Sequence, residues 1–323
     1  MTSTGGRPSR RRFLHLAAAA GVGASTGLVS EARASTAQPR KVAIVPFASA
    51  PFPFRGRDPD TNDTFLDVVA NGRRGHTSSR GGVYWEDTTF SDNRVLMGLP
   101  RGFNIRRHAA IVVFFHGNGA QLERDVLYRQ AVLDQLEDSG FNGALLAPQF
   151  ALDALDSSAG KFWLPGGFAV FMREAASHLG KLHGTKGAEK AFIAAPIIIV
   201  AYSGGYNPAG YVLANGDEHR RIRGVILLDA VFGNERAFAQ WITREHRAAF
   251  LFSAYGAASE AGNLALERLL KVTPIHVTDG VPRTLGPDVV GFLRTPNEVD
   301  HNDFVTNAWE RWPVKALLER TTI

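Results

Sequence analysis

The stretch from Pro196 to Tyr206 constrains this chain more than any other. Residues 197–201 are continuously apolar, which is typical of a short strand buried on both faces of a parallel sheet. The run ends in Tyr-Ser-Gly-Gly, and a helix start is expected around Pro208, because proline is favoured in a first helical turn. A strand, a tight turn that carries Ser203 and a helix together form the geometry of a nucleophile elbow. Ser-Gly-Gly is also common in ordinary turns, so the stretch needs support from elsewhere in the chain.

The residues two before and two after the serine are Ala201 and Gly205. Both are small enough to let the strand and helix backbones close around a strained serine. The usual elbow pattern has glycine in the first of these places, so Ala201 is a departure from it.

The first 34 residues carry an export pattern. Residues 9–14 read Ser-Arg-Arg-Arg-Phe-Leu, an Ala- and Gly-rich run covers residues 16–29, and Ala32-Arg33-Ala34 offers a small-x-small cleavage site. This pattern resembles a twin-arginine (Tat) signal, and the alternative is a basic, frayed amphipathic tail. The apolar run is too short for a membrane span. We therefore expect the Tat machinery to export the chain, cleavage near Ala34, and a periplasmic or secreted mature protein without stable membrane insertion.

Removing this segment changes what the charge implies. The chain has a formal net charge of +5, and residues 1–34 hold five arginines against one glutamate, a net of +4, which leaves +1 for the remainder. The basic pI therefore does not indicate a nucleic-acid or anionic-membrane partner. The chain has no cysteine, which excludes disulfides and thiolate metal sites. The 323 − 34 = 289 remaining residues are enough to bury a core without such staples.

Residues 35–81 form a predicted N-terminal arm and surface cover, because Gly, Arg, Pro, Asp and Asn dominate from 51 to 82. Residues 41–47 are a plausible first strand, and 83–85 and 94–97 are predicted as short antiparallel strands at a sheet edge. Residues 82–323 are assigned to one catalytic domain, since no repeat or linker interrupts them.

From residue 109 apolar strands alternate with helical periodicity, which predicts an α/β fold: a mostly parallel sheet with helices on both faces. Ligands of such sheets bind beyond the carboxyl ends of the strands. Strands are expected at 109–115, 143–147, 197–201, 223–229, 249–253 and 289–293, and helices at 121–138, 167–182, 208–215, 235–243, 260–271 and, broken at Pro313, 305–320.

Polar residues follow several of these strands directly. His116-Gly-Asn-Gly comes after the 109–115 strand, where a loop can supply one backbone N–H to an oxyanion hole, and the residue after the nucleophile supplies the other. The expected donors are Asn118 and Gly204. An ordinary strand-to-helix turn would also suit this sequence, and His116 is expected to orient the loop rather than act as a base.

Asp229 ends the strand that follows the elbow helix, where a buried carboxylate is costly unless it is paired. It is the expected partner of a catalytic histidine, although it could instead cap the next helix. The more common place for the acid is one strand later, but no carboxylate occurs there before Glu260. Asp279, Glu260 and Asp300 remain the alternatives.

His301 lies just past the last predicted strand and is the only one of ten histidines at a strand end downstream of both Ser203 and Asp229. The order Ser203, Asp229, His301 matches the hydrolase order Ser…Asp/Glu…His. Four weak signals thus fall in the right order, each at a strand end.

Residues 82–312 resemble an α/β-hydrolase-fold serine hydrolase, and more narrowly exported bacterial hydrolases with a His-Gly-x-Gly loop, a Tyr-Ser-Gly-Gly elbow and a Leu-Leu-Asp-Ala strand end. The resemblance implies that Ser203 is the nucleophile, that His301 acts as base and then acid, and that water resolves an acyl-enzyme. Ala201 and the early acid depart from the family pattern.

The loop 149–167 is the expected substrate rim, in which Phe162 and Trp163 either line an acyl or aryl pocket or serve as core lids. Without a long lipase-like lid, a small-molecule carboxylic ester is the favoured substrate. An amidase or peptidase, an acyltransferase and a catalytically inactive binding protein are the alternatives. No cofactor or metal is expected, because the sequence has no cysteine ligand, paired histidines at metal spacing or phosphate loop.

Overall fold

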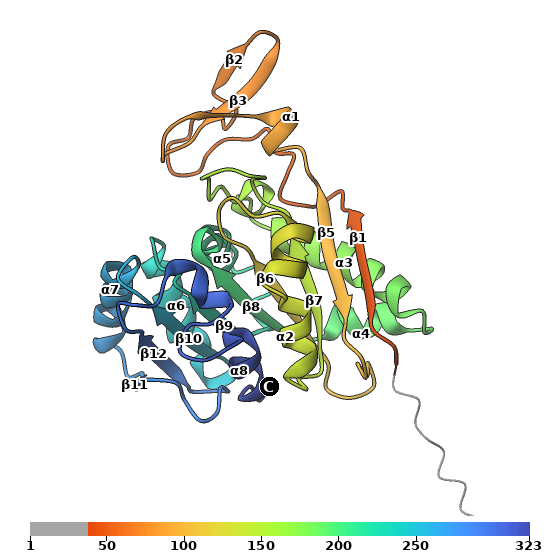
Figure 1. The fold of residues 1–323 in the computed structure, drawn as a ribbon, viewed down its shortest axis with the longest axis vertical. Helices are drawn as coiled ribbons and strands as arrows, with labels where there is room; N and C mark the ends of the chain where they lie inside the picture. Colours follow the sequence, from red (N-terminus) through yellow and green to blue (C-terminus); the bar gives the residue numbers. More distant parts are fainter. Residues whose placement is uncertain (1–37) are drawn as a thin grey trace, which may run out of the picture. The chain divides into compact units, whose positions relative to one another are not determined.

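A computed structural model of the chain describes residues 38–323, and a nine-stranded sheet lies at their centre (Figure 1). From β7 to β11 all neighbouring strands are parallel, whereas β5 runs antiparallel to both β1 and β7. The predicted mostly parallel sheet is confirmed. In spatial order the strands are β1 (Lys41–Pro46), β5 (Arg94–Leu99), β7 (Gly143–Pro148), β6 (Ala110–Phe115), β8 (Ile197–Tyr202), β9 (Ile222–Leu228), β10 (Phe250–Tyr255), β12 (Val290–Arg294) and β11 (Val277–Asp279).

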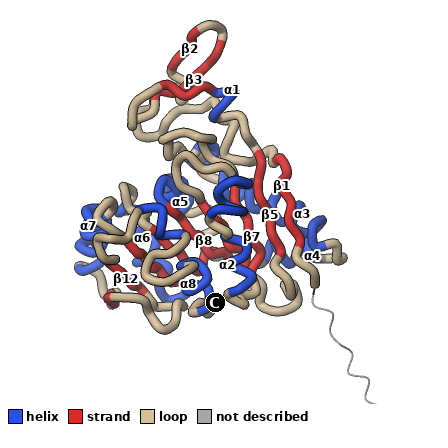
Figure 2. The backbone as a smooth tube through the Cα atoms, viewed as in Figure 1, coloured by secondary structure: helices blue, strands red, loops and turns tan. Residues whose placement is uncertain are grey.

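The central strands are apolar throughout because helices cover both of their faces. Along β8, Ile197, Ile199 and Ala201 pack into one core and Ile198, Val200 and Tyr202 into the other. The alternation of helices and strands along the chain is visible in Figure 2. One face carries α3 (Gly167–His183), α4 (Ala188–Ala194), α5 (Tyr206–Asn215), α6 (Glu235–Glu245) and α7 (Glu260–Lys271); the other carries α2 (Val132–Asp138) and α8 (Pro313–Glu319).

Two predicted helices differ from the structure. The predicted 121–138 helix is a π-helical segment, Leu122–Arg129, followed by α2, with Ala131 between them at a φ of +49°. A left-handed residue cannot continue a right-handed helix, so the single helix was wrong. At the end of the chain only α8 follows Pro313, and residues 306–312 are not helical.

The N-terminal region differs from its prediction in the pairing of one strand. The strand predicted at residues 41–47 is present as β1, at the edge of the central sheet. Val83–Trp85 does not join that sheet: as β4 it pairs with β3 (Arg73–Thr77), which pairs with β2 (Val68–Ala70), in a separate three-stranded sheet followed by α1 (Glu86–Thr89) (Figure 1). A three-residue apolar run is too short to show which partner it pairs with.

Aromatic packing attaches this small sheet to the rest of the molecule. Phe65 contacts Phe52, Phe90 and Trp163 at ring-centroid distances of 5.0–5.8 Å, and it is fully buried. Phe52, Phe65 and Phe90 belong to the same core as α3 and α5. His76 of β3 stacks on Phe65 at a ring-centroid distance of 4.3 Å, which joins the small sheet to this core.

The predicted signal segment, residues 1–34, lies outside the described residues. Within residues 38–323, no helix combines the length and the apolar character that crossing a membrane would require.

Candidate active site

Ser203 follows β8 directly and begins α5 through a single 3₁₀ turn. Its φ is +51°, in the left-handed region that a side-chain-bearing residue rarely adopts, as an elbow requires. A Cβ at Gly205 would lie 2.3 Å from the carbonyl oxygen of Phe115. Glycine at this position lets the turn lie against the end of β6, and Ser203 is held at the carboxyl edge of the sheet.

The structure brings Ser203, His301 and Asp229 together. The hydroxyl oxygen of Ser203 lies 2.6 Å from His301 Nε2, and His301 Nδ1 lies 2.6 Å from Asp229 Oδ2. The three residues come from the ends of β8 and β9 and from the loop after β12. Asp229 is 1% exposed, whereas about a third of the His301 side chain is open to solvent. A buried carboxylate, an imidazole and a serine hydroxyl in this order match the arrangement that activates a serine.

Several donors surround the Asp229 carboxylate. Its Oδ1 accepts hydrogen bonds from the Gly256 backbone N–H at 3.1 Å and from the Ser259 hydroxyl. Burial alone would raise the pKa of Asp229, but the bonds from His301, Ser259 and Gly256 outweigh burial and lower that pKa below its ordinary value. The carboxylate therefore stays ionised and can fix the imidazole tautomer.

The alternative acids lie elsewhere. Asp279 is exposed at the end of the edge strand β11, and Glu260 pairs with Arg294 at 2.9 Å. Asp300 caps the 3₁₀ segment His301–Val305. Of the four carboxylates weighed from the sequence, Asp229 is the one within hydrogen-bond distance of His301.

The two expected oxyanion-hole residues are neighbours. A Cβ at Gly204 would lie 2.0 Å from the side-chain oxygen of Asn118, so a larger residue there would displace that side chain. The backbone N–H of Asn118 donates to no other residue in the described part of the chain. Gly204 lies in the first turn after Ser203, where N–H groups lack partners within the helix. Both N–H groups thus remain available for an oxyanion.

His116 holds the Asn118 loop in place. It is 2% exposed, its Nδ1 donates to the Gly117 carbonyl at 2.8 Å, and its Nε2 accepts from the Phe150 backbone N–H at 2.9 Å. Burial lowers the pKa of His116 to about 4, so the imidazole is neutral at pH 7. Its position supports the expected orienting role.

The two aromatic residues of the expected substrate rim are both buried. Phe162 is 0% exposed and packs edge-to-face on Phe168 and Phe171, so it is part of the core and does not face a ligand. Trp163 is 5% exposed and contributes to the wall of a pocket. Of the two roles predicted for Phe162, the structure matches the core lid and not the pocket lining, because helix α3 covers its ring.

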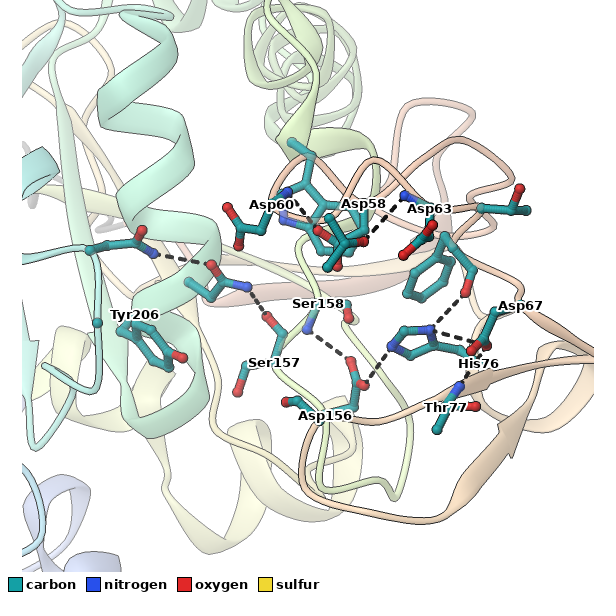
Figure 3. Close-up of a pocket in the computed structure, with 18 residues that line it drawn as sticks. Asp58, Asp60, Asp63, Asp67, His76, Thr77, Asp156, Ser157, Ser158 and Tyr206 are labelled. Carbon is teal, nitrogen blue, oxygen red and sulfur yellow. Dashed lines mark hydrogen bonds and ion pairs between the residues drawn. The ribbon is translucent and has the colours of Figure 1, made fainter.

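A pocket of about 500 Å³, here called the arm pocket, lies between the small sheet and the start of α5 (Figure 3). Ser157 and Asn207 line it, and Ser157 donates to the Asn118 side chain at 3.0 Å, so the pocket shares a wall with the oxyanion loop. Neither Ser203 nor His301 is part of its lining. Five of its lining residues are carboxylates: Asp58, Asp60, Asp63, Asp67 and Asp156.

None of these carboxylates has a lysine or arginine within ion-pair distance among residues 38–323. His76 lies among them: its Nε2 is 3.5 Å from an Asp156 carboxylate oxygen, and its Nδ1 donates to the Phe65 carbonyl at 2.7 Å (Figure 3). The described residues offer no cluster of three His, Asp or Glu side chains suited to a metal ion. The arm pocket is therefore strongly acidic and polar.

Sequence reasoning missed two residues around the site. Tyr202 stacks on the His301 ring, with ring centroids 5.2 Å apart, and its hydroxyl donates to the His301 carbonyl at 3.2 Å. Ser259 contacts Asp229 from the loop after β10. The Tyr in Tyr-Ser-Gly-Gly was a visible signal for the first; Ser259 has the sequence context of an ordinary helix cap.

The chain has the α/β-hydrolase fold, with the serine after β8 and the histidine after β12. No family model matches it, and no curated protein matches it. Among solved structures it is similar to the feruloyl esterase module from Clostridium thermocellum, at 14% identity and a TM-score of 0.45, over 83% of this chain and 97% of that one.

Two further structures are similar at the same level. An S-formylglutathione hydrolase from Agrobacterium tumefaciens aligns at 14% identity and a TM-score of 0.42, over 74% of this chain and 92% of that one. The BES protein from Bacillus cereus aligns at 13% identity and a TM-score of 0.43, over 78% and 96%. These similarities assign no role to any single residue.

Proposed function

We propose that the protein is an exported serine hydrolase that cleaves carboxylic esters through an acyl-enzyme intermediate. The observation that carries the proposal is the pair of 2.6 Å contacts that join Ser203 to His301 and His301 to Asp229. The unpaired N–H of Asn118 beside Gly204 adds the second part that acyl transfer needs.

The chemistry follows from this geometry. His301 Nε2 takes the Ser203 proton as the hydroxyl oxygen attacks the ester carbonyl, and the Asn118 and Gly204 N–H groups bind the oxyanion. The imidazolium, stabilised by Asp229, gives its proton to the departing alcohol. Water then enters by the same steps in reverse, releasing the acid and restoring Ser203.

The arm pocket favours a polar substrate. Its wall carries five carboxylates and no lysine or arginine, so it suits neither a long alkyl chain nor an anionic group. We expect short esters with a polar or cationic group to be better substrates than long-chain acyl esters.

Export rests on residues 1–34. Replacing Arg10 and Arg11 with lysine is expected to keep the chain in the cytoplasm, and N-terminal sequencing of the exported protein should begin near residue 35. Export of the doubly substituted chain at the normal level would contradict the Tat assignment.

The main test is labelling with a fluorophosphonate, followed by hydrolysis rates for acyl esters of increasing chain length. We expect a covalent label on Ser203 that is lost in Ser203→Ala. A labelled protein that cleaves amides faster than matched esters would be an amidase or peptidase, and one that transfers the acyl group to added alcohol in preference to water would be an acyltransferase. An unlabelled, inactive protein would be a binding module.

A further inference from the structure

The loop after β10 contains no carboxylate near the site, although this is the more common place for the catalytic acid. It instead supplies hydrogen-bond donors to the acid that follows β9. The Gly256 N–H lies 3.1 Å from Asp229 Oδ1, and the Ser259 hydroxyl donates to the same oxygen. Strands β9 and β10 are parallel neighbours, so their carboxyl ends meet at this point.

Ser259 occupies the N-cap position of α7 but forms no side-chain cap bond. A serine in this place normally accepts a hydrogen bond from an N–H of the first helical turn, which stabilises the helix by about 1 kcal/mol when present. Here its hydroxyl is directed to Asp229 instead. Ser259 therefore forms a hydrogen bond with the acid of the proposed triad in place of the N-cap hydrogen bond of α7.

Two further buried side chains fix the direction of that hydroxyl. Asn263 Nδ2 donates to Ser259 Oγ at 3.2 Å and to the Ser259 carbonyl at 2.9 Å, and Ser253 donates to Asn263 Oδ1 at 2.6 Å. Ser253 and Asn263 are fully buried, and Ser259 is 2% exposed. Because Ser259 Oγ already accepts a proton from Asn263, its own proton is free to point at the carboxylate.

We propose that Ser259 and Asn263 are positioning residues that hold the Asp229 carboxylate in the plane needed by His301. The inference rests on the proposed function, since it assigns a purpose to the acid of the same triad. Two donors on Oδ1 restrict rotation of the carboxylate, so Oδ2 stays directed at His301 Nδ1. The hydrogen-bonded series Ser253, Asn263 and Ser259 thus orients the acid that follows β9, while the loop after β10 supplies no acid itself.

The expected effect of Ser259→Ala is on kcat rather than KM. Removing a donor from the carboxylate makes Asp229 more basic, which stabilises the imidazolium form of its partner. The acidic limb of the kcat/KM profile should therefore move to higher pH, by about half a pH unit, and kcat should fall about tenfold. Tyr202, the other ionisable group stacked on His301, does not interfere, because burial raises its pKa well above its ordinary value.

The experiment compares Ser259→Ala, Ser259→Thr and Ser49→Ala with the wild-type protein. Thr keeps the hydroxyl and should rescue kcat to within about threefold. Ser49 is a matched control, since it is a buried serine whose hydroxyl donates to a carboxylate, that of Glu174, away from the site. The second readout is the downfield proton resonance of the His301 Nδ1–H, assigned by its absence in His301→Gln; it should shift or broaden in Ser259→Ala alone.

A lower kcat, the shifted limb and the altered resonance in Ser259→Ala, without them in Ser49→Ala, would support the proposal. Wild-type kinetics and resonance in Ser259→Ala, or equal effects in Ser49→Ala, would overturn it. If Ser259→Ala does not fold, Ser253→Ala is the deciding variant. A two- to threefold loss of kcat, with the acidic limb of the kcat/KM profile again moved to higher pH, would support the positioning role. Unchanged kcat and pH profile would refute it. Should the wild-type protein take no fluorophosphonate label, the proposed function fails, while the resonance still tests whether Ser259 positions Asp229.

Discussion

The surroundings of Asp229 and the arm pocket beside the Asn118 loop are built in opposite ways. On the acid side, Asp229 is almost inaccessible, and both of its oxygens accept hydrogen bonds from buried or half-buried donors. On the other side, the arm pocket contains five carboxylates without a lysine or arginine partner among residues 38–323. The charge of Asp229 is stabilised by hydrogen-bond donors around it, whereas the charges of the arm-pocket carboxylates face an open cavity.

Under the proposed function, this contrast separates the side chains that must hold one geometry from a pocket that would meet a substrate. A buried carboxylate that accepts three hydrogen bonds is costly to displace, so the acid side is expected to be rigid. Carboxylates at the wall of a pocket are solvated and screened, so they influence which molecules approach rather than where a proton goes. The acid side should therefore control the rate of the chemical steps, and the arm pocket should control the choice of substrate.

The largest effect is expected from Ser203→Ala. Without the hydroxyl no acyl-enzyme forms, so kcat for a short ester should fall by about 10⁴-fold or more, measured under single-turnover conditions. The melting temperature should change little, since the hydroxyl makes a single contact, with His301. Retained turnover in Ser203→Ala would show that Ser203 is not the nucleophile, and the comparison of the two regions would then have no bearing on catalysis.

The next effect distinguishes the acid side from the far edge of the sheet. Asp229→Asn leaves the shape of the site but presents an amide to His301, which disturbs the tautomer and should lower kcat about 10³- to 10⁴-fold. Asp279→Asn, at the exposed end of β11, should stay within twofold of the wild-type rate. If Asp279→Asn proves the damaging change, the acid assignment is wrong.

The pH dependence of the free energy of unfolding tests His116, which holds the Asn118 loop between the two regions. The pKa of His116 is lowered to about 4 in the folded protein, so the unfolded chain takes up a proton below about pH 6.5 and the folded protein does not. The stability from this residue is complete above pH 6.5 and is lost as the pH falls toward 4. Between pH 7 and pH 5 the loss should be about 2 kcal/mol in urea titrations, and in His116→Gln the unfolding free energy should depend less on pH by that amount.

The smallest effect concerns the arm pocket. The double substitution Asp58→Asn and Asp63→Asn removes two charges that no basic side chain compensates, and KM for a cationic ester should rise about three- to tenfold at low salt. The KM for a neutral ester of the same size and both kcat values should stay within twofold. An equal rise for both esters would show that the charges act on the fold and not on the substrate.

The strand ends and their residues could be predicted because a parallel sheet gathers them at one edge. Continuous apolar runs mark the buried strands. Ser203 and Asp229 follow such a run directly, and His301 lies in the loop after the last of them. Their mutual distance then follows from sheet topology rather than from any local pattern. Their roles in catalysis stay predictions until the variants are measured.

The interactions that the sequence does not predict are those set by distant packing. Phe162 and Trp163 look alike in the sequence, yet contact with α3 buries Phe162 in the core while Trp163 reaches the wall of the arm pocket. Ser259 has the sequence context of a helix cap, and only the position of β9 beside β10 shows that its hydroxyl turns to Asp229. The contact of Phe65 with Trp163 likewise joins residues that are far apart in the sequence.

Because β1 is the outermost strand of the central sheet, the segment before residue 82 cannot be trimmed to obtain a smaller enzyme. A chain beginning at residue 82 would leave the backbone N–H and C=O groups along one side of β5 without partners, forming an exposed template for self-association. It would also lose Phe52 and Phe65 from the core. Such a shortened product is expected to accumulate as insoluble material, so an intact β1 is a condition for keeping the folded protein in solution.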